Sequence, residues 1–186
     1  MFVSNLFSIR SVLYLYDMQF KETQQFRQWY IWLILPSTAA LLMFDFVYSY
    51  KAGSGGKFSY TFAFSVIPIL ILLLFWLLRL DTTVDANGVQ YRFFPFTKTK
   101  RLPWSDVETA YVRKYNPLTE YGGWGLRKGL RSKNYAYNVA GNMGLQLVLK
   151  NGKRFLLGTQ RADELTAVME ELYQSGVVAK GQYDKF

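Results

Sequence analysis

Two long stretches without charged residues dominate the first 80 residues of the chain. Residues 59–78 form the longer stretch, with 20 uncharged residues in the order SYTFAFSVIPILILLLFWLL. A helix of that length extends about 30 Å, which is the thickness of the hydrocarbon core of a bilayer. Residues 29–44 form the other stretch, and it reaches Val47 if Asp45 is tolerated near its end. The alternative, two core helices of a soluble domain, is disfavoured because the second stretch has no polar face. We therefore predict two transmembrane helices, at about 29–47 and 59–79.

The residues that flank the two predicted helices indicate how they are oriented. Tryptophan, tyrosine and arginine border both stretches, as expected at the two membrane–water interfaces. Residues 48–58 form a short Gly/Ser-rich loop that makes the helices an antiparallel pair, the transmembrane hairpin of residues 29–80. The loop carries only Lys51 and Lys57, whereas more Lys and Arg residues lie before the first helix and after the second. The excess of cations predicts a multi-pass protein with both termini in the cytoplasm.

Residues 1–28 precede the hairpin and are predicted to be a cytoplasmic or interfacial segment. Its first part, residues 1–17, is apolar and aromatic and lacks the pattern of a cleaved signal peptide. Two interpretations remain open for residues 1–17. They form an interfacial helix, or they are an extension upstream of a true start at Met18.

The sequence changes character after residue 80, where turn signals and alternating apolar residues replace the long apolar stretches. Asn87-Gly88 and Asn151-Gly152 each lie between alternating segments, which is the strongest short signal for a β-hairpin. Further strands are predicted at 100–103, 107–114 and 134–139. Leu165, Val168, Met169 and Leu172 recur at helical spacing, which predicts one amphipathic helix at about 161–174. Residues 81–176 are therefore expected to form a mostly-β sandwich or open barrel capped by a C-terminal helix, and residues 177–186 a tail.

The composition excludes several classes of protein. The chain has no Cys and no His, so disulfides, thiolate nucleophiles, histidine-ligated metals and Ser-His-Asp triads are absent. It also lacks a phosphate-binding glycine loop, a nucleophile elbow and a cluster of metal ligands. We therefore predict that the protein is not an enzyme and uses no cofactor and no metal.

Several short stretches resemble an uncharacterised bacterial family of two-span membrane proteins with a C-terminal pleckstrin-homology-like (PH-like) domain. The resemblance covers residues 18–172. Its motifs are Phe20-Lys21-Glu22, Phe26-Arg27-Gln28-Trp29, Tyr91–Phe96 (YRFFPF), Glu120–Gly125 (EYGGWG), Tyr137–Asn142 (YNVAGN) and Gly158-Thr159-Gln160. It implies the PH-like fold and a bacterial inner-membrane location, and it carries no activity with it. The chain departs from lipid-binding PH domains because the turn after its first predicted strand, residues 85–88, is short and has no cation.

The candidate binding surface is a stretch rich in cations, aromatics and glycines between residues 111 and 144. Aromatic and basic side chains together suit a loop that meets anionic lipid headgroups, although a solvated basic loop is the plain alternative. Trp124, between glycines, is either a surface anchor or a packed core residue. The predicted contact residues are Arg127, Lys128, Arg131, Lys133 and Trp124, with Tyr121 and Arg113 at the margin.

These features predict a non-catalytic, membrane-anchored binding or scaffold module whose PH-like domain contacts anionic lipid, a peptide or a neighbouring protein. The predicted partners are therefore membrane lipids and other membrane proteins; a homo-oligomer is compatible with the sequence, and nucleic acid is not expected as a partner. The alternative is an accessory or assembly subunit of a larger membrane complex, because residues 36–40 give the first helix a face of small residues. A third hypothesis makes the protein part of a transporter that uses Asp45, the one acid in the spans.

Overall fold

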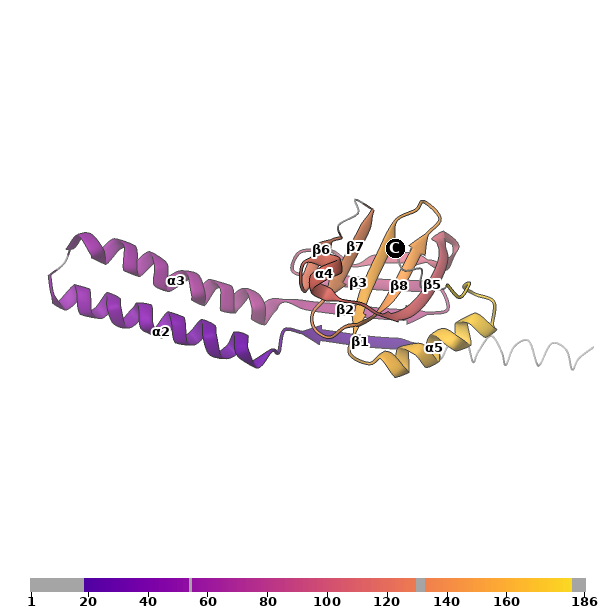
Figure 1. The fold of residues 1–186 in the computed structure, drawn as a ribbon, viewed down its shortest axis with the longest axis horizontal. Helices are drawn as coiled ribbons and strands as arrows, with labels where there is room; N and C mark the ends of the chain where they lie inside the picture. Colours follow the sequence, from indigo (N-terminus) through magenta and orange to yellow (C-terminus); the bar gives the residue numbers. More distant parts are fainter. Residues whose placement is uncertain (1–18, 54, 130–132, 182–186) are drawn as a thin grey trace, which may run out of the picture. The chain divides into compact units, whose positions relative to one another are not determined.

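The computed structural model describes residues 19–53, 55–129 and 133–181, and it divides into two compact units (Figure 1). The helical unit is the continuous segment Gln25–Leu78. The β unit contains the residues before it, through Gln24, and all residues from Arg79 onward. The predictions for residues 1–17 and for Arg131 lie outside the described residues.

The helical unit is a pair of helices. They are α2 (Trp29–Lys51) and α3 (Gly55–Leu77). Phe46, near the end of α2, packs against Phe62, near the start of α3, with ring centroids 5.5 Å apart. At the other end of the pair, Phe26 meets Phe75 edge-to-face at 5.2 Å. These contacts confirm the predicted antiparallel pairing.

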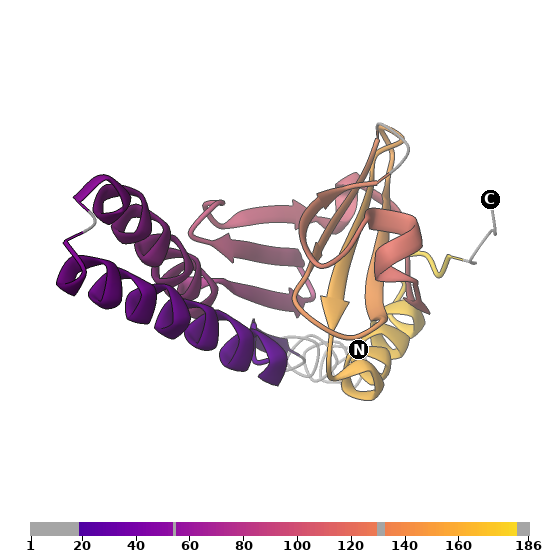
Figure 2. The same cartoon turned by 60° about the vertical axis from the view of Figure 1, so that its left-hand side comes forward.

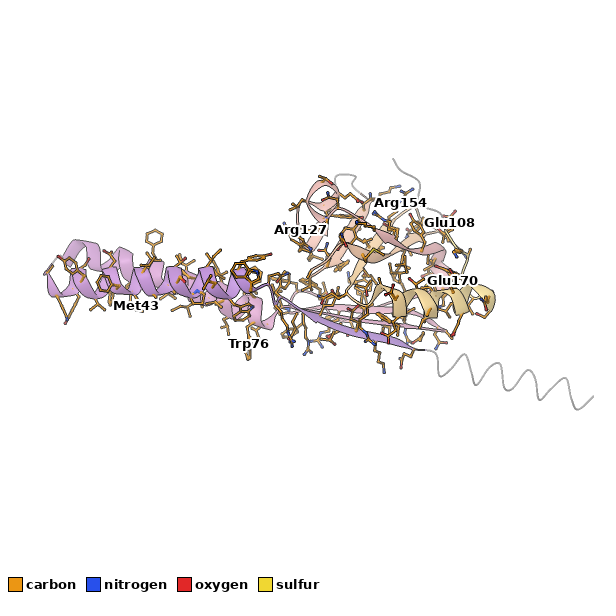
Figure 3. The ribbon with its side chains drawn as sticks, turned by 60° about the horizontal axis from the view of Figure 1, so that its bottom comes forward. Met43, Trp76, Glu108, Arg127, Arg154 and Glu170 are labelled. Carbon is orange, nitrogen blue, oxygen red and sulfur yellow. The ribbon has the colours of Figure 1, made fainter. Side chains whose placement is uncertain are left out.

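One helix of this pair is long and apolar enough to cross a membrane. It is α2, whose most apolar window has a mean hydropathy of 1.7 and contains no buried residue. Its side chains, and those of α3 such as Trp76, project outward from the ribbon (Figure 3). The apolar part described for α3, Val66–Leu77, is too short to cross by itself. The structure therefore supports one membrane helix directly.

The β unit consists of two sheets and a C-terminal helix. The first sheet has the order β1 (Phe20–Gln25), β2 (Arg79–Asp85), β3 (Gly88–Phe94), β4 (Lys100–Pro103). The second has the order β5 (Val107–Lys114), β8 (Met143–Leu149), β9 (Arg154–Thr159), β7 (Asn134–Asn138), β6 (Gly125–Lys128). The short helices are η1 (Trp104–Asp106) and α4 (Pro117–Tyr121), and the C-terminal helix is α5 (Ala162–Gln174). The strands of one sheet run across those of the other (Figure 2). The prediction of a mostly-β domain that ends in one helix is confirmed.

Aromatic rings fill the space between the two sheets. Tyr91 on β3 lies with its ring 4.9 Å from Tyr137 on β7 and 6.3 Å from Phe155 on β9, measured between centroids. The apolar face of α5 is buried, as the helical spacing predicted; Leu165 and Met169 are each 1% exposed. Burying both sheets and one helix face gives the β unit a core of its own.

The strand β1 is the main difference from the predicted organisation. Residues 20–25 were assigned to the N-terminal segment, but they form an edge strand beside β2. Alternate side chains of β1 are buried, and two of these are polar, Glu22 and Gln24. The connection between the first two strands is therefore the helical unit. The turn at residues 85–88 joins the second and third strands, so its shortness carries no argument about a binding loop between the first two.

The Asn-Gly signal at residues 87–88 is confirmed as the β2–β3 turn. The Asp85 carboxylate accepts hydrogen bonds from the backbone N–H groups of Asn87 and Gly88, at 2.7 and 3.1 Å. A Cβ at Gly88 would lie 2.3 Å from the carbonyl oxygen of Leu102, so a residue without a side chain is required there.

The start of the predicted tail belongs to the β unit. Ala110 on β5 donates its N–H to the carbonyl oxygen of Ala179 at 3.1 Å, and its own carbonyl oxygen accepts from Gly181 at 3.0 Å. Val178 is 7% exposed. Residues 178–181, the first part of the tail predicted at 177–186, therefore run along the sheet edge beside β5, where Lys180 forms an isolated bridge with Ala110.

Candidate functional site

The predicted contact surface centres on the hairpin formed by β6 and β7. Gly125 of β6 pairs with Asn138 of β7, and Lys128 pairs with Tyr135. Since β6 is the last strand of its sheet, no strand formed by the described residues lies beside its other edge. Cations on such an edge discourage pairing with another chain. The edge position thus gives these cations a structural reason to be exposed, alongside any role in binding.

Four of the predicted contact residues lie on this hairpin or at its base. Arg127, Lys128 and Lys133 are exposed, and Trp124 is half-buried. Figure 3 shows Arg127 at the outer edge of the β unit. Lys128 and Lys133 flank the hairpin tip, at the opposite end of β7 from Asn138. The hairpin therefore presents three positive charges to solvent among its described residues.

Trp124 is held by the loops at the base of the hairpin. Its indole Nε1–H donates to the carbonyl oxygen of Gly141 at 3.0 Å. Its own carbonyl oxygen accepts from Nε of Arg127, also at 3.0 Å. The glycines on either side have positive φ angles, 120° at Gly123 and 112° at Gly125, which side chains rarely allow. The Gly-Gly-Trp-Gly motif therefore has a local structural explanation, and Trp124 is neither a core residue nor a free anchor.

The structure places Arg113 and Tyr121 inside the β unit, so they are not part of a contact surface. Arg113 is 8% exposed, and its NH2 group lies 2.7 Å from the carboxylate of Glu120. The same guanidinium donates from Nε to the side-chain oxygen of Gln146 at 3.1 Å, and from NH2 to the hydroxyl of Tyr121 at 3.3 Å. A buried cation with these partners holds α4 against the sheet, and it is a structural residue.

The tyrosines beside Arg113 are held in their neutral form. Burial raises the pKa of Tyr115 to about 12, although the hydrogen bond from Asn138 opposes that rise. Burial likewise raises the pKa of Tyr121, and the nearby Arg113 charge lowers it in part. Both hydroxyls therefore carry their proton at neutral pH.

The β unit has two surface grooves of note. One groove, of about 730 Å³, is lined by Trp124, Lys114 and Glu120, among others. The carboxylate of Glu120 is already paired with Arg113. Another, of about 640 Å³, lies between β4 and the β8–β9 turn over the rings of Tyr91 and Phe155. The second groove is lined by four cations, namely Lys100, Arg101, Lys150 and Lys153, and by one acid, Asp106. The second groove is not evident from the sequence because its cations come from two distant segments, residues 100–101 and 150–153.

A buried polar contact between β1 and the end of β9 is likewise not evident from the sequence. The Glu22 carboxylate accepts from the Thr159 hydroxyl at 2.7 Å and from the Gln160 backbone N–H at 2.9 Å. The Gln24 amide nitrogen donates to the carbonyl oxygen of Gly158 at 2.6 Å. Two of the motifs quoted for the family resemblance, at residues 20–22 and 158–160, therefore meet in space. The presence of both motifs in this chain is therefore explained by the packing of β1 against the end of β9.

Comparison with known proteins leaves the family open. No protein-family model matches the chain, and no curated protein is significantly similar to it. The bacterial PH-like family therefore remains a prediction based on the quoted motifs.

Proposed function

We propose that α2 and α3 cross the membrane as a hairpin and anchor the β unit on one side of it. The main support is the connectivity of the first sheet. Strand β1 precedes α2, strand β2 follows α3, and the two strands are hydrogen-bonded neighbours. Neighbouring strands lie about 5 Å apart, so both ends of the helical unit leave the membrane on the same side. If α2 crosses, α3 must cross back.

The lengths and flanking residues of the helices fit this proposal. Helix α3 has 23 residues, which corresponds to about 34 Å. Trp29 and Tyr48 of α2 are 73% and 67% exposed, and 19 residues separate them, about 28 Å along the axis. Aromatic side chains at that separation match the two interfaces of a bilayer core. The cation bias then favours an orientation with the termini and the β unit in the cytoplasm. The bacterial inner membrane is the location that the family resemblance implies.

The β unit is best explained as a non-catalytic binding or scaffold module. The observation that carries this proposal is the exposed basic β6–β7 hairpin with Arg127, Lys128 and Lys133. An anionic partner suits it: an anionic lipid headgroup, an acidic peptide or an acidic patch on a neighbouring protein. Because the partner is met beside the anchor, its effective concentration is high, and weak contacts suffice.

An accessory subunit of a larger membrane complex is the second candidate. In α2, Ser37 and Thr38 donate their hydroxyls to the carbonyl oxygens of Leu33 and Ile34, at 2.6 and 2.7 Å. These hydroxyls need no partner in the lipid. The small side chains of residues 37–40, of which 37, 38 and 40 are exposed, allow another helix to approach closely.

Vesicle flotation of the β unit tests the module proposal. The protein must retain β1, because a fragment that starts at residue 81 loses the edge strand and leaves Thr159 without Glu22. A soluble variant is obtained by replacing residues 26–78 with a short Asn-Gly turn between β1 and β2. Its binding to vesicles of phosphatidylcholine, with and without phosphatidylglycerol, is measured across a salt series.

Charge reversal identifies the surface responsible. Each cation near an anionic surface contributes about 1 kcal/mol, so changing Arg127, Lys128 and Lys133 to Glu should weaken binding by about 100-fold or more. A control variant with Lys21, Lys150 and Lys153 changed to Glu has the same charge, and these residues are also exposed. Equal loss in both variants would contradict a specific role for the hairpin. No binding by the folded unit at low salt would exclude lipid as the partner and leave the protein partners.

A further inference from the structure

The turn between β3 and β4 lies close to the point where the chain leaves α3. Arg79, the first residue of β2, follows the end of α3 by two residues and pairs with Phe94, the last residue of β3. Because β3 runs antiparallel to β2, the chain that leaves β3 at Phe94 heads back toward Leu78. One peptide unit separates Leu78 from Arg79, the β2–β3 pairing joins Arg79 to Phe94, and two peptide units separate Phe94 from Phe96. Together these steps keep the Cα of Phe96 within about 17 Å of the Cα of Leu78. This limit holds for every orientation of the two units.

The turn holds one large apolar side chain in an exposed position. The ring of Phe96 stacks on that of Phe93, at 6.3 Å between centroids and 11° between planes. Thr97 fixes the turn because its N–H donates to the carbonyl oxygen of Phe93, and its hydroxyl accepts from the Phe93 N–H, both at 2.8 Å. Phe93 is 1% exposed, whereas Phe96 is 58% exposed. The exposed ring is therefore supported from beneath by the core.

Such exposure is rare in the β unit. Among the described residues of this unit, only three large apolar side chains are exposed, namely Phe96, Leu118 and Leu126. A single exposed apolar side chain is ordinary on a protein surface. Phe96 is distinguished by its place near the end of α3 and by the cations around it.

Cations surround this turn. The guanidinium groups of Arg92 and Arg79 lie over the ring of Phe94, at 4.9 and 5.5 Å from its centroid. Lys98 is exposed at the end of the turn. Asp81 is the acid beside them, and it pairs with Arg79 at 3.2 Å. Arg92 and Lys98 thus leave an excess of positive charge next to Phe96, a combination that suits the boundary between anionic headgroups and acyl chains.

We propose that residues 94–98 form a membrane-contacting turn. Phe96 enters the headgroup–acyl boundary of the bilayer that holds α3, and Arg92 and Lys98 bind lipid phosphates beside it. The inference rests on the proposed anchoring, because it requires α3 to lie in the membrane. It differs from the hairpin proposal because the chain itself keeps this turn close to the end of α3, whereas the β6–β7 hairpin is far from α3 along the chain.

Site-directed spin labelling of the full chain tests the turn. The natural sequence has no Cys, so each single-Cys variant carries one label. Phe96→Cys places the label on the turn, and Lys98→Cys leaves Phe96 intact in case the first variant fails to fold. Asn87→Cys is the matched control, since Asn87 is exposed at the opposite end of the same strand pair, about 20 Å away along β3. Leu41→Cys reports on α2, where Leu41 is 71% exposed.

The variants are reconstituted in nanodiscs of phosphatidylcholine with phosphatidylglycerol. Accessibility to oxygen, which partitions into lipid, is compared with accessibility to a water-soluble nickel complex. The oxygen-to-nickel ratio is expected to be several-fold higher at residues 96 and 98 than at residue 87, and highest at residue 41. In phosphatidylcholine alone the contrast between residues 96 and 87 should decrease. An unchanged contrast would overturn the role given to Arg92 and Lys98.

The two proposals fail in different ways. If the label at residue 41 is deep and those at 96 and 98 are as accessible to nickel as that at 87, the membrane-contacting turn is refuted and the anchoring stands. If the label at residue 41 is itself accessible to nickel, the anchoring is refuted, and the turn proposal with it.

Discussion

Replacing Arg113 by Met should unfold the β unit more readily without weakening a surface interaction. The substitution keeps a side chain of similar length and removes a guanidinium that is 8% exposed. The strongest hydrogen bonds lost are those to the Glu120 carboxylate at 2.7 Å and to the Gln146 side-chain oxygen at 3.1 Å; the longer one to the Tyr121 hydroxyl is lost with them. Arg127→Met, at an exposed position, removes the same charge and serves as the control.

The size of the effect follows from the burial of each partner. Breaking a fully buried ion pair by removing one member costs about 3–5 kcal/mol. The Glu120 side chain is 31% exposed and keeps its hydrogen bond from the Asn116 N–H at 2.8 Å, so we expect about 2 kcal/mol for this pair. Leaving the buried oxygen of Gln146 without a donor adds about 1–3 kcal/mol. The total for Arg113→Met is therefore about 3–5 kcal/mol, against less than about 0.5 kcal/mol for Arg127→Met.

Urea unfolding of the soluble β unit, followed by circular dichroism, measures both variants. Arg113→Met should shift the midpoint strongly, and its remaining folded fraction should still bind anionic vesicles. Arg127→Met should keep the midpoint and weaken vesicle binding. If Arg113→Met unfolds within about 0.5 kcal/mol of the unmodified protein, or loses vesicle binding while folded, the structural role assigned to Arg113 is refuted.

Three further predictions concern the packing of the β unit. Glu22→Ala removes the acceptor of the Thr159 hydroxyl and should lower the free energy of unfolding by about 2–3 kcal/mol in the same urea assay, whereas Lys21→Ala, at the exposed neighbouring position, should change it little. Gly158→Ala should lower the melting temperature by about 5 °C or more, because the new Cβ would lie 2.8 Å from the Cβ of Asn138; an unchanged melting temperature would show that the β7–β9 packing is looser than described. The raised pKa of Tyr115, about 12 against 10.0 in the unfolded chain, means that its contribution to stability is complete below about pH 10 and decreases as the pH rises toward 12. Thermal melts between pH 9 and 12 should show that decrease, and Tyr115→Phe should make it smaller; an equal slope in both proteins would contradict the assignment.

Local patterns in the sequence predicted most of the β unit. The turn at Asn87-Gly88 was found because Asn-Gly between two alternating apolar segments is typical of a β-hairpin. The C-terminal helix was found because Leu165, Met169 and Leu172 follow the helical repeat and all three are buried. Such features depend on residues close together in the chain, and sequence patterns report them directly.

The parts that the sequence did not predict depend on contacts between distant residues. Strand β1 carries Glu22 and Gln24 on its buried face, and their partners lie more than 130 residues away, at 158–160. A polar residue at a buried position breaks the apolar alternation by which strands are recognised. Arg113 was assigned to the surface for the same reason, since its buried partner Gln146 lies 33 residues further along the chain.

The membrane hairpin is the central claim, and labelling of single cysteines from the two sides of the membrane tests it most directly. Ala52→Cys places a thiol in the α2–α3 connection, and Lys21→Cys and Lys153→Cys place thiols on the β unit, all at exposed positions. In intact bacterial cells, a membrane-impermeant maleimide should label residue 52 and should label residues 21 and 153 only after the membrane is permeabilised. Labelling of residue 52 on the same side as residues 21 and 153 would show that the helices do not cross and would contradict the account.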